Sequence, residues 1–346
     1  MTPPTPGSQA WLELAHEPTL DPDRPIIDPH HHLWRSVGGR SRYLLGDLWA
    51  DTGSGHHITK TVFIECRASY RTAGPDHLKP VGETEFVAGI ARASRDVSVG
   101  GCGGGGGGGA VISGIVAHAD LRGGARLKEA LQAHADASDG LFRGIRHAGA
   151  RDPHPEALTI PGRAPEGLYA DADFRAGLGL LGEMGLTYDT WHYHHQNAAF
   201  AELARAVPGT TMVLDHFGTP LGVGPYAGQR EAIFTQWQRD IEAIAACPNV
   251  VAKLGGLAMP DNGFGWHLRD RPASSDELLA AQARYYHHAI ACFGPARCMF
   301  ESNFPVDRWS LPYGVYWNAM KKLAARYTAA EQQAMFHDNA ERVYRL

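Results

Sequence analysis

Eight short apolar runs, most of them followed by an amphipathic stretch, constrain the fold of this chain more than any other sequence feature. The runs cover residues 25–30, 60–66, 111–118, 141–147, 186–192, 211–216, 249–254 and 297–303. Each has the length of a β-strand. Thr61–Ile64 and Val250–Ala252 are apolar on both faces, as expected of parallel strands covered by helices.

Six helices are predicted between these runs, because apolar residues recur there at spacings of three and four positions. They cover residues 84–94, 125–137, 172–184, 198–206, 231–246 and 275–293. Strands that alternate with helices imply a parallel sheet, and eight such strands can close on themselves. We therefore predict an α/β protein with one (β/α)8 TIM-barrel domain at residues 25–346, preceded by an N-terminal extension at residues 1–24.

A glycine run interrupts this alternation at residues 100–109, where Cys102 is the one residue that is not glycine. Such a run costs too much conformational entropy to form the interior of a helix or strand. It lacks the G-x-x-x-x-G-K-[ST] pattern of a phosphate loop, and it precedes a predicted strand instead of following one. We predict a flexible surface loop here.

Composition argues against a nucleic acid or a membrane as a partner. The formal net charge of −5 gives no broad basic surface, and no apolar run is long enough to span a bilayer. The first 25 residues lack the basic and apolar regions of a signal peptide, and the five cysteines form no C-x-x-C pair. We expect a cytoplasmic protein with reduced thiols that acts on a small molecule; homo-oligomer formation stays open.

Three consecutive histidines end the first predicted strand. Side chains alternate along a strand, so His30 and His32 should share one face and His31 should pack on the other. The catalytic site of such a barrel lies at the carboxyl ends of its strands. Two imidazoles on one face there can bind a metal ion or transfer protons.

The other strand ends add polar side chains to the same end of the barrel. Imidazoles and carboxylates suit a divalent metal or an acid–base site of the hydrolase type. Arg146 and Lys253 suit a carboxylate on the substrate. The remaining residues expected to contact substrate are His147, Tyr193 and Trp34.

Five segments occur in a characteristic order: Asp28-x-His30-x-His32, Gly144–His147, Leu214–Gly218, Lys253–Gly256 and Asn339–Leu346. Together they resemble the amidohydrolase-2 branch of the amidohydrolase superfamily, from about residue 25 to the C-terminus. The resemblance implies a distorted (β/α)8 barrel in which water attacks a carbonyl of a small organic substrate. That branch includes lactonases and, more distantly, decarboxylases.

The resemblance also implies roles for single residues. His30 and His32 match a pair that binds metal in some members and contacts substrate in metal-free ones. His216 matches a histidine near the scissile carbonyl. If a divalent metal is bound, zinc first and manganese next, its expected ligands are His30, His32, His192 and His216; a metal-free enzyme is the alternative.

The eighth strand departs from the family pattern. It reads Glu301-Ser302-Asn303-Phe304-Pro305 where the family usually has Gly-Ser-Asp-Trp-Pro, so an uncharged amide replaces a carboxylate. Glu301 can supply the missing carboxylate if a regular strand places it on the same face as Asn303. Alternatively Glu65 supplies it, or the usual water-activating step is absent and the chemistry is metal-free or different.

These observations predict a hydrolase that opens a lactone, or a related cyclic ester or amide, of a small carboxylated substrate. Its expected catalytic residues are His30, His32, Glu65, His216, Glu301 and Asn303. One alternative is a metal-dependent non-oxidative decarboxylase. Another is a barrel that has lost catalysis and serves as a binding protein.

Overall fold

Eight parallel strands, paired in sequence order, form one sheet in the computed structural model, which describes residues 4–36, 41–100 and 109–346. The strands are β1 (Ile26–His31), β2 (Ile58–Ile64), β3 (Val111–Ala117), β4 (Phe142–Arg146), β5 (Thr187–Thr190), β6 (Met212–Leu214), β7 (Val250–Leu254) and β8 (Cys298–Phe300). A parallel bridge between His31 and Phe304 joins the chain after β8 back to β1. Register shifts along the first three strand pairs distort the barrel. The predicted (β/α)8 barrel is confirmed.

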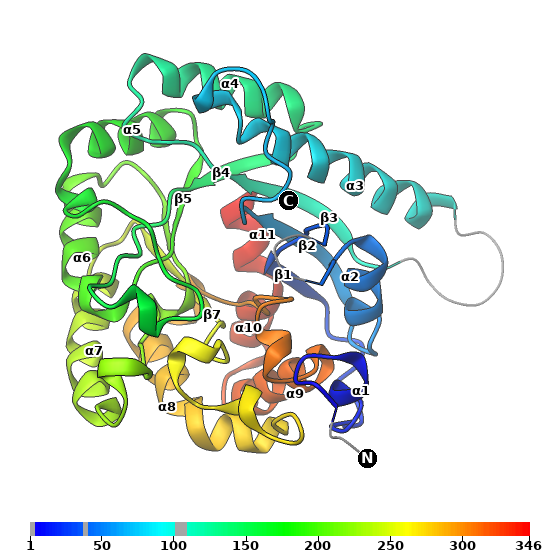
Figure 1. Ribbon diagram of the computed structural model, residues 1–346. Helices are drawn as coiled ribbons and strands as arrows, with labels where there is room; N and C mark the ends of the chain where they lie inside the picture. The colour runs from blue at the N-terminus through cyan, green and yellow to red at the C-terminus, as the bar shows by residue number, and fades with distance from the viewer. Residues whose placement is uncertain (1–3, 37–40, 101–108) are drawn as a thin grey trace.

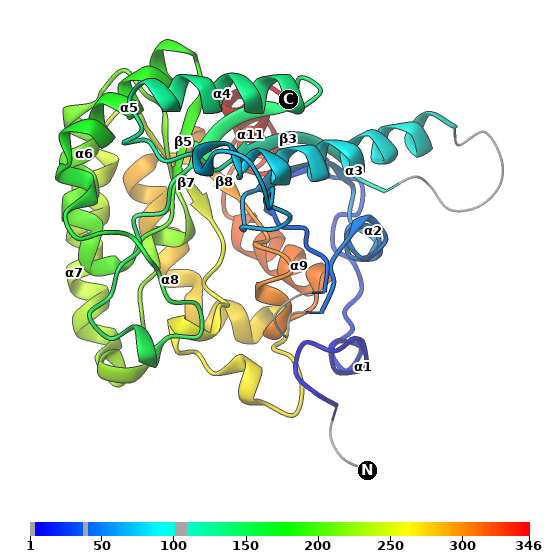
Figure 2. The same ribbon diagram turned by 45° about the horizontal axis from the view of Figure 1, so that its top comes forward.

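Helices surround the strands as an outer ring (Figure 1). They are α1 (Gln9–Leu12), α2 (Leu45–Thr52), α3 (Val81–Gly100), α4 (Ala125–Ala137), α5 (Ala172–Glu183), α6 (Asn197–Ala206), α7 (Arg230–Ala245), α8 (Ser275–Phe293), α9 (Tyr313–Ala324), α10 (Ala329–Gln333) and α11 (Asn339–Tyr344). All six predicted helices are present. The first of them, α3, is longer than the predicted 84–94, and Figures 1 and 2 both show its last turns projecting beyond the sheet. Residues 101–108 of the predicted glycine loop lie outside the described residues.

The barrel interior is apolar at one end and polar at the other. Its apolar layer consists of Ile27, Val62, Ile64, Val116, Val213, Val251 and Met299, packed against Ala340, Val343 and Tyr344 of the C-terminal segment. Figure 1 shows α11 (red) inside the ring of strands. Because α11 fills the amino-terminal end of the barrel, the carboxyl end, hereafter the mouth, is left for the polar residues.

Several strands end earlier than the apolar runs predict. β5 ends at Thr190, β6 at Leu214 and β8 at Phe300. In the loops after β6 and β8 the backbone becomes left-handed, with φ of 53° at His216 and 55° at Asn303. Strand parity therefore does not apply to these loops, which corrects the expectation that Glu301 and Asn303 lie on one regular strand face.

The predicted N-terminal extension packs against the barrel in its described part. The Trp11 side chain is fully buried, and its indole N–H donates to the carbonyl of Arg269 at 3.0 Å. The amide of Leu20 donates to Asn318 Oδ1 in α9 at 2.9 Å. A search of the described residues finds no helix with the length and apolar character that a membrane span requires.

Candidate active site

A single carboxylate links two of the predicted histidines at the mouth. Glu301, the first residue after β8, has Oε2 2.6 Å from His30 Nδ1, and its Oε1 accepts a hydrogen bond from His216 Nδ1 at 2.7 Å. The centroids of the two imidazole rings are 4.6 Å apart. Of the three possibilities for the missing eighth-strand carboxylate, the structure therefore places Glu301 at the histidines.

Asn303 is turned toward another acid. Its Nδ2 donates to Asp307 Oδ1 at 2.9 Å, and both side chains are buried. Burial raises the pKa of Asp307 to about 7. The uncharged amide thus lies beside a carboxyl group that is itself costly to ionise, and a second carboxylate at position 303 would repel it.

Asn303→Asp, which restores the residue usual in the family, should therefore destabilise the fold. Two buried carboxyl groups would share one site, so their folded-state pKa values would lie above those of the unfolded chain. Stability from such groups is present at low pH and is lost as pH rises through the raised pKa. We expect the free energy of unfolding in urea to fall by about 1–3 kcal/mol near pH 8 and by less near pH 5. An equal loss at both pH values would contradict this.

The two cations predicted to bind substrate are each flanked by carboxylates of the protein. Arg146 Nε donates to Glu65 Oε1 at 3.0 Å, its Nη2 donates to the Glu65 carbonyl, and its Nη1 lies 3.4 Å from Asp215 Oδ2. Lys253 Nζ lies 2.8 Å from Asp189 Oδ2 and 3.3 Å from Asp215 Oδ1. Burial lowers the pKa of Lys253, but these carboxylates outweigh it and hold the net pKa above its usual value. Both cations stay charged, and their charges are balanced within the protein.

A substrate at the mouth can reach part of the network that these histidines, carboxylates and cations form. The side chains of five members have no exposed surface: His30, Asp189, Asp215, Lys253 and Glu301. A thin exposed edge remains on the others, with 3% of the His216 side chain, 4% of His32 and 8% of the Arg146 side chain accessible. His32 and His216 are therefore the imidazoles placed to touch a bound molecule, and His30 lies beneath them.

The pKa values of the two accessible histidines are shifted in opposite directions. The ring of His32 donates from Nδ1 to the carbonyl of Ile64 at 2.8 Å, which leaves Nε2 as a lone-pair acceptor. Burial and then the charge of Arg146 lower the pKa of His32 well below its usual value, so the ring is neutral. Burial also lowers the pKa of His216, but Glu301 outweighs it and raises the net pKa, which favours the protonated ring. Both rings pack against His30, with centroid distances of 4.9 Å for His32 and 4.6 Å for His216. A base and an acid placed in this way are suited to proton transfer.

The other two polar residues of the first-strand motif, Asp28 and His31, stabilise the fold. Asp28 Oδ2 accepts hydrogen bonds from the hydroxyls of Ser302 at 2.6 Å and Tyr313 at 2.8 Å, which ties β1 to the segment after β8. His31 is buried, its Nε2 lies 3.1 Å from Thr61 Oγ1, and its ring packs edge-on against Phe63. The predicted packing role of His31 is confirmed.

The structure does not bring His192 and Tyr193 to the histidine cluster. His192 Nδ1 lies 3.1 Å from the Tyr169 hydroxyl and its Nε2 lies 2.9 Å from Asn197 Oδ1, so both ring nitrogens already have partners. This corrects the prediction of His192 as a metal ligand, which assumed a longer β5. The Tyr193 hydroxyl instead anchors the loop after β4, donating to the Ile160 carbonyl at 2.9 Å.

Trp34 and Tyr344 complete the surroundings of the cluster. The Trp34 ring stacks on His32 with centroids 6.1 Å apart, and its role as a wall of the site stays a prediction. Tyr344 was not predicted: its hydroxyl donates to Asp189 Oδ2 at 2.5 Å from inside the barrel. The sequence signal for it was the terminal segment Asn339–Leu346, whose resemblance carried no role for this tyrosine.

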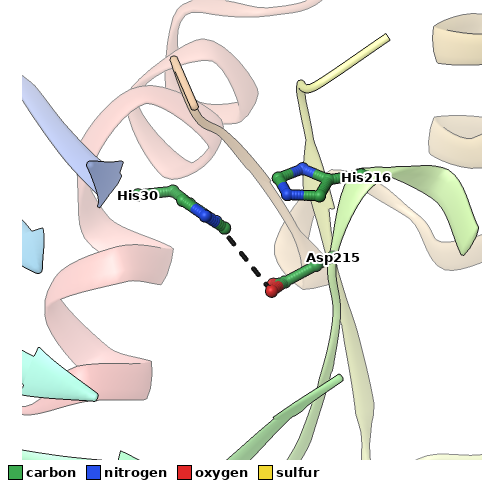
Figure 3. A group of neighbouring side chains, drawn as sticks. All are labelled: His30, Asp215 and His216. Carbon is green, nitrogen blue, oxygen red and sulfur yellow. Dashed lines mark ion pairs between the residues drawn. The ribbon is translucent and has the colours of Figure 1, made fainter. Parts of the chain in front are cut away.

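The side chains present do not fit a divalent metal. His30, Asp215 and His216 offer three donor atoms within 4.8 Å of one another (Figure 3). However, Arg146 Nη1 lies 3.4 Å from both His30 Nε2 and Asp215 Oδ2. Lys253 Nζ lies 3.5 Å from His30 Nδ1, and both histidines already contact the bridging carboxylate. A divalent cation among these donors would face two buried positive charges a few ångströms away.

Comparisons with known proteins agree with this architecture. A model of the amidohydrolase family matches residues 27–346. Uncharacterized protein y4mH of Sinorhizobium fredii is 31% identical over 94% of this chain and 99% of its own length. L-fucono-1,5-lactonase of Burkholderia multivorans is 26% identical over 92% of this chain and 96% of its own length.

A solved structure shows the same fold. The crystal structure of an amidohydrolase from Burkholderia multivorans with bound zinc has a TM-score of 0.70 and 24% identity, covering 93% of this chain and 99% of that one. The family match spans nearly the whole described barrel, and one relative exceeds 30% identity over nearly the whole chain. The chain therefore belongs to the amidohydrolase family.

Proposed function

We propose that this protein is a hydrolase that opens a lactone by attack of water on the ring carbonyl, and that it does so without a metal ion. The observation that carries the proposal is the pairing of a neutral His32 with a protonated His216 at the accessible edge of the site. The likeness to L-fucono-1,5-lactonase, at 26% identity, supports a cyclic ester as the substrate.

In this mechanism His32 Nε2 takes a proton from water as the water oxygen bonds to the carbonyl carbon. His216, held by Glu301 through Nδ1, donates from Nε2 first to the carbonyl oxygen as a hydrogen bond and then to the ring oxygen as that carbon–oxygen bond breaks. The products are a hydroxyl group and a carboxylic acid, which ionises and releases one proton. The proton on His32 returns to His216 through solvent.

The buried layer beneath these two imidazoles sets their charge states. Glu301 raises the pKa of His216 and also contacts His30. Arg146 and Lys253 lie beside His30, and Glu65, Asp189 and Asp215 balance their charges. The hydrogen bond from His216 is therefore the interaction that stabilises the oxyanion that develops during attack.

The rate of lactone opening should have a bell-shaped dependence on pH. The base His32 acts when neutral and its pKa is lowered, so kcat/KM should fall as pH drops through a value below 6.5. The acid His216 acts when protonated and its pKa is raised, so kcat/KM should fall as pH rises through a value above 6.5. Initial rates measured across pH, with the non-enzymatic opening of the lactone subtracted, check both limbs.

His32→Gln should abolish the acidic limb and lower kcat/KM by about 100-fold, because the general base is lost. His31→Gln is the matched control, since this neighbouring histidine is equally buried and packs against Phe63 away from the site. Its pH profile should match that of the wild type. An acidic limb that survives in His32→Gln would contradict the assignment of the base.

Product analysis tests the proposed function itself. We expect a panel of γ- and δ-lactones to include substrates that release one proton per turnover with no loss of carbon. A decarboxylase would release carbon dioxide from hydroxybenzoate-type acids, and a binding protein would release neither product. Either of these results would overturn the proposal.

A further inference from the structure

Two histidines beside the network, His118 and His147, take no part in the mechanism above. They follow β3 and β4 at the mouth, with ring centroids 5.3 Å apart. Val116, two residues before His118, packs in the barrel interior, so alternation directs His118 toward the same side of β3. His118 Nδ1 lies 3.0 Å from the carbonyl of Arg146, whose side chain contacts the catalytic cluster. The two rings therefore adjoin the reacting centre.

Each of these rings has one nitrogen fixed by the backbone. The carbonyl of Arg146 accepts from His118 Nδ1, so Nε2 is the nitrogen of this ring that is left for a ligand, as an acceptor when the ring carries one proton. The amide of Leu121 donates to His147 Nδ1 at 3.2 Å, which makes Nε2–H of that ring a donor. Within the described part of the chain neither Nε2 has a hydrogen-bond partner, and neither is among its fully buried unpartnered atoms. The pair thus presents one acceptor and one donor to a ligand.

A tyrosine hydroxyl supplies a third polar atom. Tyr70, in the loop after β2, stacks on His118 with centroids 6.4 Å apart and an interplanar angle of 20°. Its hydroxyl is buried and has no hydrogen-bond partner among the described residues. A buried hydroxyl without a partner is costly, and a bound ligand that pairs with it would remove that cost.

Two of the three groups are uncharged. Burial lowers the pKa of His147 to about 3 and raises the pKa of Tyr70, so both groups are neutral near pH 7. Two arginines act on them: Arg122, which is paired with Asp120 at 2.9 Å, and Arg67, an exposed residue of the loop after β2. The neutral donors and acceptors themselves are suited to hydroxyl groups.

We propose that His118, His147 and the Tyr70 hydroxyl form a subsite that binds the hydroxyl groups of a polyhydroxylated lactone. The inference rests on the proposed lactonase function. It replaces the carboxylated substrate expected from the sequence with a lactone that carries hydroxyl groups. The lactone carbonyl would lie at His32 and His216, and the hydroxyl-bearing carbons would extend toward β3 and β4.

The test compares two kinds of substrate in the same variants. Aldono-1,5-lactones carry ring hydroxyls, and δ-valerolactone is the same ring without them. In His147→Phe and His118→Phe, we expect kcat/KM for the best aldonolactone to fall about 10- to 100-fold, as expected for a lost hydrogen bond in a recognition site. The value for δ-valerolactone should stay within about threefold, because the catalytic cluster is unchanged.

Two further variants control for damage to the fold. His118→Gln keeps a side-chain acceptor and should retain more aldonolactone activity than His118→Phe. His77→Phe changes an outer-surface histidine that contacts Glu129, and it should change neither substrate's rate. Equal losses for both substrates, or no loss for either, would overturn the subsite while leaving the lactonase function intact. A wild-type protein that opens no lactone would overturn both.

Discussion

Glu301→Gln should lower kcat for lactone opening by about 100- to 1,000-fold, the range associated with loss of an acid–base partner. The carboxylate contacts His30 and His216 at 2.6 and 2.7 Å, and its charge keeps the His216 ring protonated. A neutral glutamine cannot raise the pKa of His216. The basic limb of the pH profile should therefore move to lower pH, toward the range in which His32 titrates.

Glu301→Asp is the informative companion. It keeps the negative charge but is shorter by one methylene, so it cannot reach both imidazoles as Glu301 does. We expect a smaller loss of kcat and a basic limb nearer to that of the wild type. Thermal unfolding of both variants separates a catalytic loss from a structural one. A Glu301→Gln enzyme with an unchanged basic limb would show that another group sets the charge of His216.

Lys253→Met should lower the free energy of unfolding by about 3–5 kcal/mol, the cost of breaking a buried ion pair from one side. Its ammonium lies 2.8 Å from Asp189 and 3.3 Å from Asp215, and none of the three side chains is exposed. Without it, two buried carboxylates lack their cation and their folded-state pKa values rise. The loss should therefore be larger near pH 8 than near pH 5.

Two variants make this prediction specific. Adding Asp189→Asn to Lys253→Met removes one of the uncompensated charges and should recover part of the lost stability. Lys321→Met is the matched control, because the ammonium of Lys321 donates to the carbonyls of Leu20 and Asp21 and not to carboxylates. Lys321→Met should lower the free energy of unfolding by less than Lys253→Met does. Urea unfolding measures all three; no recovery in the double variant would contradict the ion-pair account.

The order of the elements could be predicted from sequence because each strand and helix has its own periodicity. All eight strands and six of the helices follow from local patterns, and α11 filling the barrel does not. The terminal segment was recognised only as a motif. Its packing against interior residues such as Ile64 and Val116 is a contact between segments far apart in the chain, and such contacts have no local signal.

The residues of the site could largely be predicted from sequence, but not which of them contact one another. His30, His32 and His216 lie together as expected, whereas His192 does not, because β5 ends two residues before it. The apolar run continues past the last paired residue, so sequence could not reveal that boundary. The left-handed backbone at His216, in the loop after β6, is likewise a tertiary property.

Charge balance is a further property that sequence cannot provide. Arg146 and Lys253 look like free cations for a substrate carboxylate when only the strand ends are known. In the folded protein Asp215 lies beside both of them, at 3.4 Å from Arg146 and 3.3 Å from Lys253. This neutralisation separates the hydroxylated substrate proposed above from the carboxylated one expected at first.

Metal removal tests the central claim most directly. The purified protein should be treated with a strong chelator and its metal content measured by elemental analysis. Its rate of opening the best lactone should then be recorded before and after addition of zinc or manganese. We predict an undiminished rate at a metal content far below one ion per chain, with no gain on addition. A rate that falls with the metal and returns with it would contradict the account.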